Sequence, residues 1–254
     1  MIRSPLEVVL TETPVPDSVV PRYELAEWRQ QFGLVAGITG AGPDGDLALA
    51  TPDPAVAVLE RWRAFRRIMR PQFSAVAVGT QRHGTALAVH EQDAGMCVVD
   101  DIDGHLTLRA GLLLAVTVAD CVPVYLAHPE SGTIALLHAG WRGIAAGIVE
   151  QGINRLCNIA RSSPEQIVIH CGVSICGNCY EVGSEVKEQL LGVKESPGPV
   201  DLRAVIAARA AKTAVDRVTA SSWCTAHDGP RFYSYRASAG TTHRMLAYLG
   251  RPSS

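Results

Sequence analysis

The 254-residue sequence contains no long hydrophobic run and no excess of charge of either sign. Its longest nearly apolar run, residues 112–119, is far shorter than the roughly 20 residues that cross a bilayer as a helix. The first residues, MIRSPLEVVLTE, lack the apolar centre of a signal peptide. A net charge of −2 gives no electrostatic reason to expect nucleic acid or an anionic membrane as a partner. We therefore expect a soluble cytoplasmic protein that binds neither.

The cysteines also lack the regular pairing of a disulfide framework. There are seven of them, an odd number, at irregular intervals. Without a visible export signal, we expect thiols or metal ligands in a reducing compartment. Cys176 and Cys179 form one C-x-x-C pair after Cys171, but a cysteine-rich zinc site needs four ligands and usually two such pairs. Because Cys224 is the only later cysteine, we interpret the pair as small residues in a tight loop.

The most informative stretch is residues 116–143. Two β-rich apolar runs, 116–126 and 133–137, flank the turn sequence HPESG, a pattern that predicts a β-hairpin. Folded symmetrically between residues 129 and 130, the hairpin sets Cys121 opposite His138, with Cβ atoms about 4.5–5.5 Å apart. A thiol and an imidazole at that separation can share a metal ion or a proton. The alternative is a buried core cysteine and a structural histidine.

The remaining segments alternate between strand and helix patterns. We expect strands at 33–39, 73–80 and 112–118, and helices at 53–69, 143–160, 201–215 and 242–249. Residues 96–100 and 106–109 are expected to pair as a hairpin across Asp103-Gly104. No repeat, low-complexity segment or linker interrupts the chain, so we expect residues 1–254 to form one domain.

Four separated motifs carry a resemblance to a known family. They are QRHG at 81–84, TVADCVPV at 117–124, HAGWRG at 138–143 and GVSICGNCYEVG at 172–183. In this order they resemble the YfiH-type laccase-domain family, whose members are also called polyphenol oxidases or purine nucleoside phosphorylases. The resemblance covers about residues 33–250. It implies a single compact α/β (α+β) domain with mixed β-sheets flanked by helices, a fold similar to that of a toxin deamidase with a Cys–His pair.

The resemblance also implies a metal centre. The family holds one mononuclear zinc ion with two histidines and one cysteine, which correspond here to His83, Cys121 and His138. Three protein ligands with an open fourth position are typical of catalytic zinc. Copper is the alternative metal, because two histidines and a cysteine also form blue-copper sites.

The family is linked to phosphorolysis of adenosine, inosine and methylthioadenosine, and to adenosine deamination. Phosphorolysis needs an anion site, for which Arg142 and Arg236 or Arg244 are candidate phosphate ligands. Asp120 is a candidate acid–base group or a residue that orients a ligand, and Asn178 and Tyr180 are candidate substrate contacts. The expected partners are a small-molecule nucleoside and phosphate. The sequence leaves monomer and homodimer open.

The sequence departs from the family pattern in its arginines. The early GFSTR-x-GG motif appears only as GITGAG at 37–42, and SYRR appears as SYRA at 234–237. Three alternatives to the nucleoside enzyme therefore stay open. They are a non-catalytic metal-binding relative, a copper-dependent phenol oxidase, and a hydrolase with Cys121 as nucleophile and His138 as base. The phenol oxidase is disfavoured, because a multicopper laccase usually has His-x-His pairs and none of the eight histidines forms one.

Overall fold

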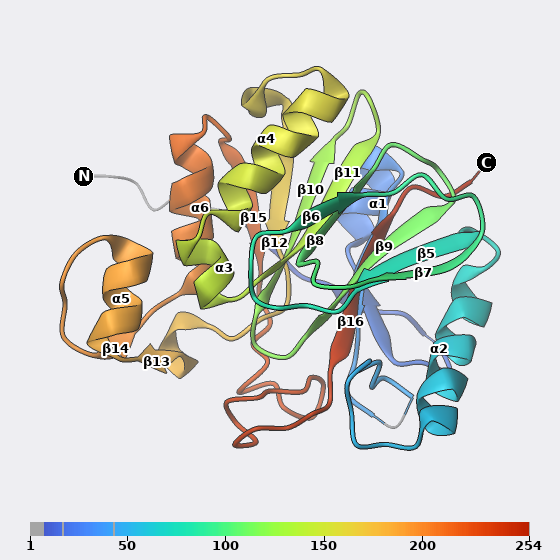
Figure 1. Ribbon diagram of the computed structural model, residues 1–254, viewed down its shortest axis with the longest axis horizontal. Helices are drawn as coiled ribbons and strands as arrows, with labels where there is room; N and C mark the ends of the chain where they lie inside the picture. The colour runs from blue at the N-terminus through green and yellow to red at the C-terminus, as the bar shows by residue number, and fades with distance from the viewer. Residues whose placement is uncertain (1–7, 17, 43, 254) are drawn as a thin grey trace.

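Two seven-stranded mixed sheets stacked on each other dominate the described residues, 8–16, 18–42 and 44–253, of the computed structural model (Figure 1). The first sheet has the order β1-β15-β12-β10-β11-β8-β6. Its strands are β1 (Val8–Leu10), β6 (Leu87–Val89), β8 (Gly104–Thr107), β10 (Val122–His128), β11 (Thr133–Ala139), β12 (Val168–Cys171) and β15 (Arg217–Ser221).

The second sheet has the order β2-β3-β4-β16-β9-β5-β7. Its strands are β2 (Thr13–Pro14), β3 (Arg22–Glu24), β4 (Val35–Thr39), β5 (Ala75–Gly79), β7 (Gly95–Val99), β9 (Leu112–Val118) and β16 (Met245–Gly250). The helices are α1 (Ala26–Phe32), α2 (Ala55–Met69), α3 (Trp141–Ala145), α4 (Ile148–Ala160), α5 (Ser184–Leu191) and α6 (Leu202–Lys212). The short elements are η1 (Pro164–Gln166), η2 (Gly177–Cys179), β13 (Glu181–Val182) and β14 (Gly198–Pro199).

Strand β9 shows how the sheets divide the core. Successive side chains of a strand point to opposite faces. Leu112 and Leu114 accordingly pack toward Tyr125 of the first sheet, whereas Leu113 packs toward Phe65 of α2. Both faces of β9 are buried, which explains its continuous apolar sequence.

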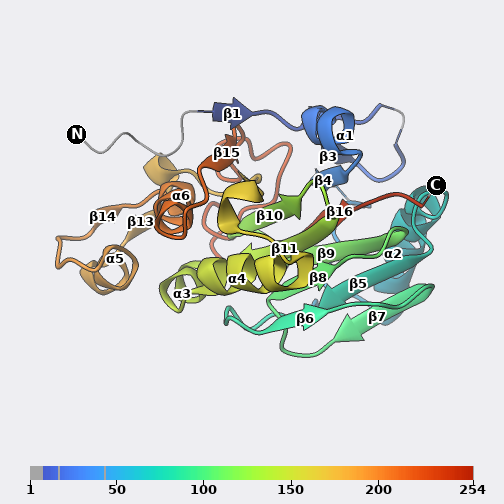
Figure 2. The ribbon, with the colours of Figure 1, turned by 90° about the horizontal axis from the view of Figure 1, so that it is seen from above.

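Three helices cover the outer faces of the two sheets. Helices α4 and α6 lie on one side and α2 on the other (Figure 1). Helix α5 and the β13–β14 pair lie at the end of the molecule far from α2 (Figure 2). The predicted mixed α/β fold with sheets flanked by helices is confirmed, and the assignment of residues 1–254 to one domain stays a prediction. No helix in the described ranges is both long and apolar enough to cross a membrane.

The helix expected at 242–249 is wrong, because residues 245–250 form the central strand β16. All six residues of β16 are buried between β4 and β9. A strand covered on both faces reads as an unbroken apolar run, which periodicity cannot distinguish from a buried helix.

Two further predictions fail at turns. Residues 95–99 and 104–107 do not pair with each other, since β7 joins β5 in one sheet and β8 joins β6 and β11 in the other. The helix expected at 143–160 is split into α3 and α4 at Gly147, which has a φ of 93°. Glycine adopts this left-handed conformation without steric cost, so the chain changes direction there.

Candidate metal centre and substrate site

The structure brings together the three side chains singled out by the sequence. His83 comes from the loop between β5 and β6, Cys121 from the turn before β10, and His138 from β11. Their ligand atoms all lie within 4.8 Å of one another. The imidazole rings of His83 and His138 meet edge to face, with centroids 4.7 Å apart. We refer to these three residues as the triad.

The predicted hairpin exists, but its predicted register is wrong by two residues. His138 pairs with Pro123, and Val122 with Ala139, so Cys121 lies in line with Gly140. The turn spans residues 129–132 rather than closing between 129 and 130. A slip of two residues keeps side chains on the same face of a sheet, whereas a slip of one would not. Cys121 and His138 therefore still meet, as diagonal neighbours.

Gly140 makes room for the triad. A Cβ atom built there would lie 2.9 Å from Cδ2 of His83 and 3.0 Å from Sγ of Cys121. Its φ of −79° is one that any residue adopts, so the requirement for glycine at this position is steric.

Asp103 fixes two of the three triad residues at once. Its fully buried carboxylate accepts hydrogen bonds from the backbone N–H groups of Arg82, His83 and Gly84, at 3.1, 2.9 and 2.8 Å. It also lies 2.8 Å from Nδ1 of His138. This bond leaves Nε2 of His138 free to face Cys121, as in metal sites where a carboxylate orients the ligating histidine.

The electrostatics of the triad favour charged side chains. Burial alone raises the pKa of Asp103, but hydrogen bonds from His138 and the Gly84 amide outweigh it and hold the pKa at about 2. Burial likewise opposes charge on Cys121 and His138. Their mutual attraction outweighs it, lowering the pKa of Cys121 to about 6 and raising that of His138 to about 9. Without a metal, the pair is a thiolate beside an imidazolium at neutral pH.

The triad is open on one side. His138 is buried, Cys121 is partly exposed and His83 is exposed. His83 adopts a φ of 59°, a left-handed conformation uncommon for a residue with a side chain. Gln81 holds the same loop to β9, because its amide donates to the Thr117 carbonyl at 2.8 Å and accepts from the Thr117 N–H at 2.7 Å. An ion bound by the triad would thus have a free position toward solvent.

Tyr180 and two arginines belong to the surroundings of the triad. The Arg236 guanidinium lies over the Tyr180 ring, 4.9 Å from its centroid. Burial, and then the negative charges of Cys121 and Asp120, raise the pKa of Tyr180 to about 12, while Arg236 and Arg142 lower it. The pKa of Tyr180 therefore responds to the charges of Cys121 and of both guanidinium groups.

Asp120 has both carboxylate oxygens engaged in hydrogen bonds, unlike a free acid or base. Its side chain is buried, and each carboxylate oxygen accepts a hydrogen bond. Oδ1 accepts from the Thr225 hydroxyl at 2.6 Å, and Oδ2 from the Arg236 N–H at 2.7 Å. Asp120 thereby fixes the segment that carries Arg236, and its predicted roles as an acid–base group or as a residue that orients a ligand stay predictions.

The predicted substrate roles of Arg244 and Asn178 stay predictions. The Arg244 guanidinium donates to the carbonyls of Thr241 and His243 and lies 5.8 Å from the Tyr235 ring centroid, so the described contacts of its side chain stay within its own loop. Asn178 is exposed on η2. Arg142 and Arg236 both lower the pKa of Tyr180, which Cys121 raises, whereas no such effect or hydrogen bond connects Arg244 or Asn178 with the triad among the described residues.

Comparison with known proteins assigns the chain to a family. The model of the family described as multi-copper polyphenol oxidoreductase laccase matches residues 39–252. The chain belongs to this family. A protein of Streptomyces griseus named purine nucleoside phosphorylase is 34% identical over 227 residues, which are 84% of this chain and 90% of the relative.

Two other members of this laccase-like family are informative. A protein named adenosine deaminase, from an unidentified prokaryote, is 36% identical over 103 residues, or 41% of this chain and 38% of the relative. The crystal structure of YlmD from Geobacillus stearothermophilus has a TM-score of 0.84 and 27% identity. That match covers 95% of this chain and all of the other. The predicted YfiH-type family is confirmed.

Sequence reasoning missed Asp103 and Gly140. Asp103-Gly104 was interpreted as a turn, because nothing in the local pattern shows that this carboxylate reaches a loop 20 residues earlier and a strand 35 residues later. Gly140 lies inside the HAGWRG motif, but its steric role appears only when the loop containing His83 is in place. Both residues fit a family member that binds a metal with one thiolate and two imidazoles, a set suited to zinc or copper.

Proposed function

We propose that this laccase-like family member is a zinc-dependent purine nucleoside phosphorylase acting on adenosine, inosine or methylthioadenosine. The observation that carries the proposal is the convergence of His83, Cys121 and His138 beside Tyr180 and Arg236. The name of the Streptomyces griseus relative, which matches over most of both chains, supports the same activity.

The donor set fits a catalytic zinc ion. One thiolate and two imidazoles leave a fourth position open, and Asp103 orients His138 from behind. When bound, zinc supplies a Lewis acid that polarises a substrate oxygen. The chain itself holds the thiolate deprotonated, since the pKa of Cys121 is about 6. No proton needs to leave Cys121 at neutral pH before metal binding.

The neighbouring residues suit phosphate and sugar. Phosphorolysis breaks the N-glycosidic bond and forms a bond between the anomeric carbon and a phosphate oxygen, giving a sugar 1-phosphate and a free base. Arg142 and Arg236 supply the positive charge that a phosphate dianion requires. Tyr180, with a pKa of about 12, keeps its proton at neutral pH and can donate a hydrogen bond to a substrate oxygen. Asp120 orients Arg236 through its backbone N–H.

Product analysis tests the proposal. The native protein, incubated with adenosine and phosphate, should form adenine and ribose 1-phosphate. Cys121→Ser should abolish this turnover, whereas Cys97→Ser, which removes a thiol on β7, should leave it unchanged. Zinc-loaded native protein that forms neither product would contradict phosphorolysis and favour the non-catalytic alternative.

Adenosine deamination is the second candidate, favoured by the name of the relative that shares 36% identity over 103 residues. Deamination uses a metal-activated water and an acid–base group. The same incubation separates the reactions, because deamination yields inosine without consuming phosphate. Asp120, the predicted acid–base group, has both oxygens engaged by Thr225 and Arg236. This geometry favours phosphorolysis.

Two remaining alternatives make different demands on the triad. Neither Cys/His group formed by the described residues contains more than two histidines, which argues against the histidine-rich trinuclear copper cluster of a multicopper laccase. Asp103, His138 and Cys121 do form a chain that, without metal, matches a cysteine-hydrolase arrangement. Metal analysis tests both alternatives. The phenol oxidase requires copper, and the hydrolase requires a metal-free Cys121, because a zinc-bound thiolate is not available as a nucleophile.

A further inference from the structure

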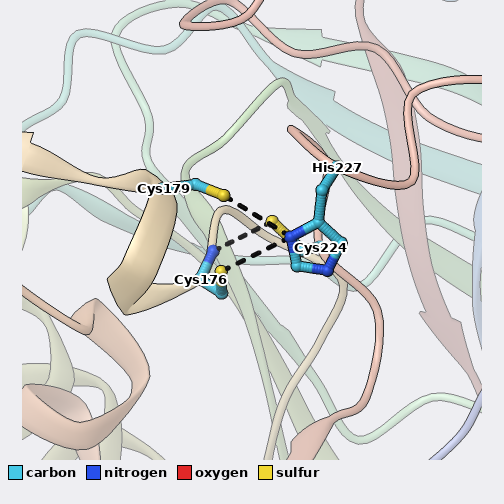
Figure 3. A group of neighbouring side chains, drawn as sticks. All are labelled: Cys176, Cys179, Cys224 and His227. Atoms are coloured by element: carbon cyan, nitrogen blue, oxygen red, sulfur yellow. Dashed lines mark hydrogen bonds between the residues drawn. The ribbon is translucent and has the colours of Figure 1, made fainter.

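A second group of metal-binding side chains lies in two loops. Cys176 is the N-cap of the 3-10 turn η2 and Cys179 is its last residue, whereas Cys224 and His227 follow strand β15. The four ligand atoms lie within 4.8 Å of one another, and Figure 3 shows the three sulfur atoms and the imidazole directed toward a common point. We call these four residues the loop cluster.

The separations match tetrahedral coordination. Zinc binds sulfur at about 2.3 Å and imidazole nitrogen at about 2.0 Å, so ligands at the corners of a tetrahedron lie roughly 3.5–3.8 Å apart. Nδ1 of His227 lies 3.4 Å from Sγ of Cys179 and 3.8 Å from Sγ of Cys176. All three cysteines are free rather than disulfide-bonded. Both separations from His227 therefore suit tetrahedral zinc, and all other ligand pairs of the cluster lie within 4.8 Å.

Backbone and carboxylate contacts hold the ligands in this arrangement. The Cys176 N–H donates to Sγ of Cys224 at 3.3 Å, and the Cys224 N–H donates to Oδ2 of Asp228 at 2.9 Å. Nε2 of His227 lies 3.7 Å from the same Asp228 oxygen, which turns Nδ1 toward the sulfurs. The two loops also meet in the pairing of Ser174 with Cys224. Such contacts behind the ligands are typical of built metal sites.

The spacing of the ligands is that of a structural zinc site. The order is C-x-x-C at 176–179 followed by C-x-x-H at 224–227, which supplies two ligand pairs and four ligands in all. The sequence interpretation of Cys176 and Cys179 as ordinary loop residues counted only cysteines and so missed the second pair. His227 completes that pair.

We propose that Cys176, Cys179, Cys224 and His227 bind a second metal ion, a zinc ion that crosslinks the two loops. A cluster of three thiolates and one imidazole fills all four positions of tetrahedral zinc, so no site is left for substrate. Three thiolates favour zinc over hard cations such as Mg²⁺. The chain would then carry two zinc ions, instead of the single ion that the family resemblance implies.

The crosslink has a consequence for the triad, and this step rests on the proposed function. The first loop continues from Cys179 directly into Tyr180, and the second runs from Cys224 through Thr225 to Arg236. Thr225 and the Arg236 backbone both bond Asp120, one residue before Cys121. The ion in the loop cluster would therefore fix the distance between Tyr180 and Arg236, the two residues that face each other beside the triad.

Metal counting tests the second site. Protein purified under reducing conditions, reconstituted with zinc and desalted, should contain two zinc ions per chain. His227→Ala and Cys121→Ser should each lower the content to one, the double variant should contain none, and Cys97→Ser should keep two. A native content of one that Cys121→Ser lowers to zero would overturn the proposal, as would a disulfide within the cluster in the reduced preparation.

Cobalt provides a readout that does not depend on activity or on the triad. In the Cys121→Ser background, Co²⁺ should give the intense thiolate charge-transfer absorption and visible bands of a tetrahedral thiolate-rich site. These bands should disappear in Cys121→Ser/His227→Ala. Their absence from Cys121→Ser would refute the second site while leaving phosphorolysis by the native protein untouched. Conversely, inactive native protein that shows them would refute only the proposed function.

Discussion

The triad and the loop cluster use the same kinds of ligand in opposite ways. The triad gathers three side chains from three distant segments around a buried carboxylate, and its exposed His83 leaves one side open. The loop cluster takes two pairs of closely spaced residues from two loops and directs four ligand atoms, rather than three, toward one centre. An open site serves chemistry and a closed one serves structure. The contrast supports the proposals that the triad is the reactive site and that the loop cluster is a crosslink.

The largest expected effect comes from removing the metal ion of the triad while the loop cluster keeps its own. A moderate chelator should first take the ion from the open triad, because a ligand can enter its free position. Nucleoside phosphorolysis should fall to background while far-ultraviolet circular dichroism stays unchanged. Added zinc should restore the activity. If half of the zinc cannot be removed selectively, or if its removal leaves turnover intact, the division between an open and a closed site is broken.

In metal-free protein, the pH dependence of alkylation at Cys121 should report its pairing with His138. Burial opposes ionisation of Cys121, but the charges and hydrogen bonds of His138 and His83 lower its pKa from 9.0 to about 6. A thiol with a lowered pKa becomes reactive as pH rises through that lower value. Alkylation at Cys121, followed by peptide mass spectrometry, should therefore have its midpoint near pH 6. His138→Ala should move the midpoint upward, and an unmoved midpoint would contradict the pairing.

His227→Ala should lower stability more than activity per folded molecule. An ion that binds only the folded state adds about 4 kcal/mol when its free concentration is 1,000 times its dissociation constant. Losing the ion at the loop cluster removes this contribution, which chemical denaturation in buffered zinc measures. The exposed His243, which pairs with Asp46, provides the control variant His243→Ala. Equal losses in both variants would argue against a metal crosslink.

Asp103→Asn should weaken zinc binding at the triad by about 10–100-fold, the usual cost of removing a carboxylate behind a ligating histidine. The matched control is Asp101→Asn, whose exposed carboxylate pairs with exposed Arg82 and should contribute little. Competition with a zinc indicator, in the His227→Ala background, measures the triad alone. Unchanged affinity in Asp103→Asn would show that the His138 orientation does not depend on this carboxylate.

Gly140→Ala should give the smallest effect. The new methyl group would meet His83 and Cys121 at 2.9 and 3.0 Å, and overpacking of this kind costs about 1–3 kcal/mol. Gly183→Ala is a close control, because Gly183 also precedes a helix in an extended conformation but has nothing within 4 Å of the added atom. Zinc affinity at the triad should fall only in Gly140→Ala. Equal affinities would show that His83 moves aside freely.

Sequence reasoning reached the triad because its three members lie in distinctive motifs, and the structure joins them as expected. It could not supply Asp103, whose partners are far away in the chain, or the register that sets Gly140 beside Cys121. Strands such as β5 and β9 were found from their β-branched and apolar residues. Strand β16 was not found, because burial on both faces removes the alternation that distinguishes strand from helix.

The two clusters also differ in how close together their ligands lie in the sequence. The loop cluster consists of two short motifs that are visible without any fold, yet His227 was overlooked because the search counted cysteines alone. Its four residues needed only one long-range contact, the meeting of two loops, to become a site. The triad needed two sheets, a turn and a buried carboxylate, so family resemblance was required to find it.

The position of β16 has a consequence for biosynthesis. It is the last strand of its sheet to be translated, yet it separates β4 from β9 and hydrogen-bonds to both. Until residues 245–250 leave the ribosome, those two strands have no native neighbour on their facing edges. The nascent chain must therefore carry two unfinished halves of a sheet through most of its synthesis, with exposed edges that chaperones can recognise.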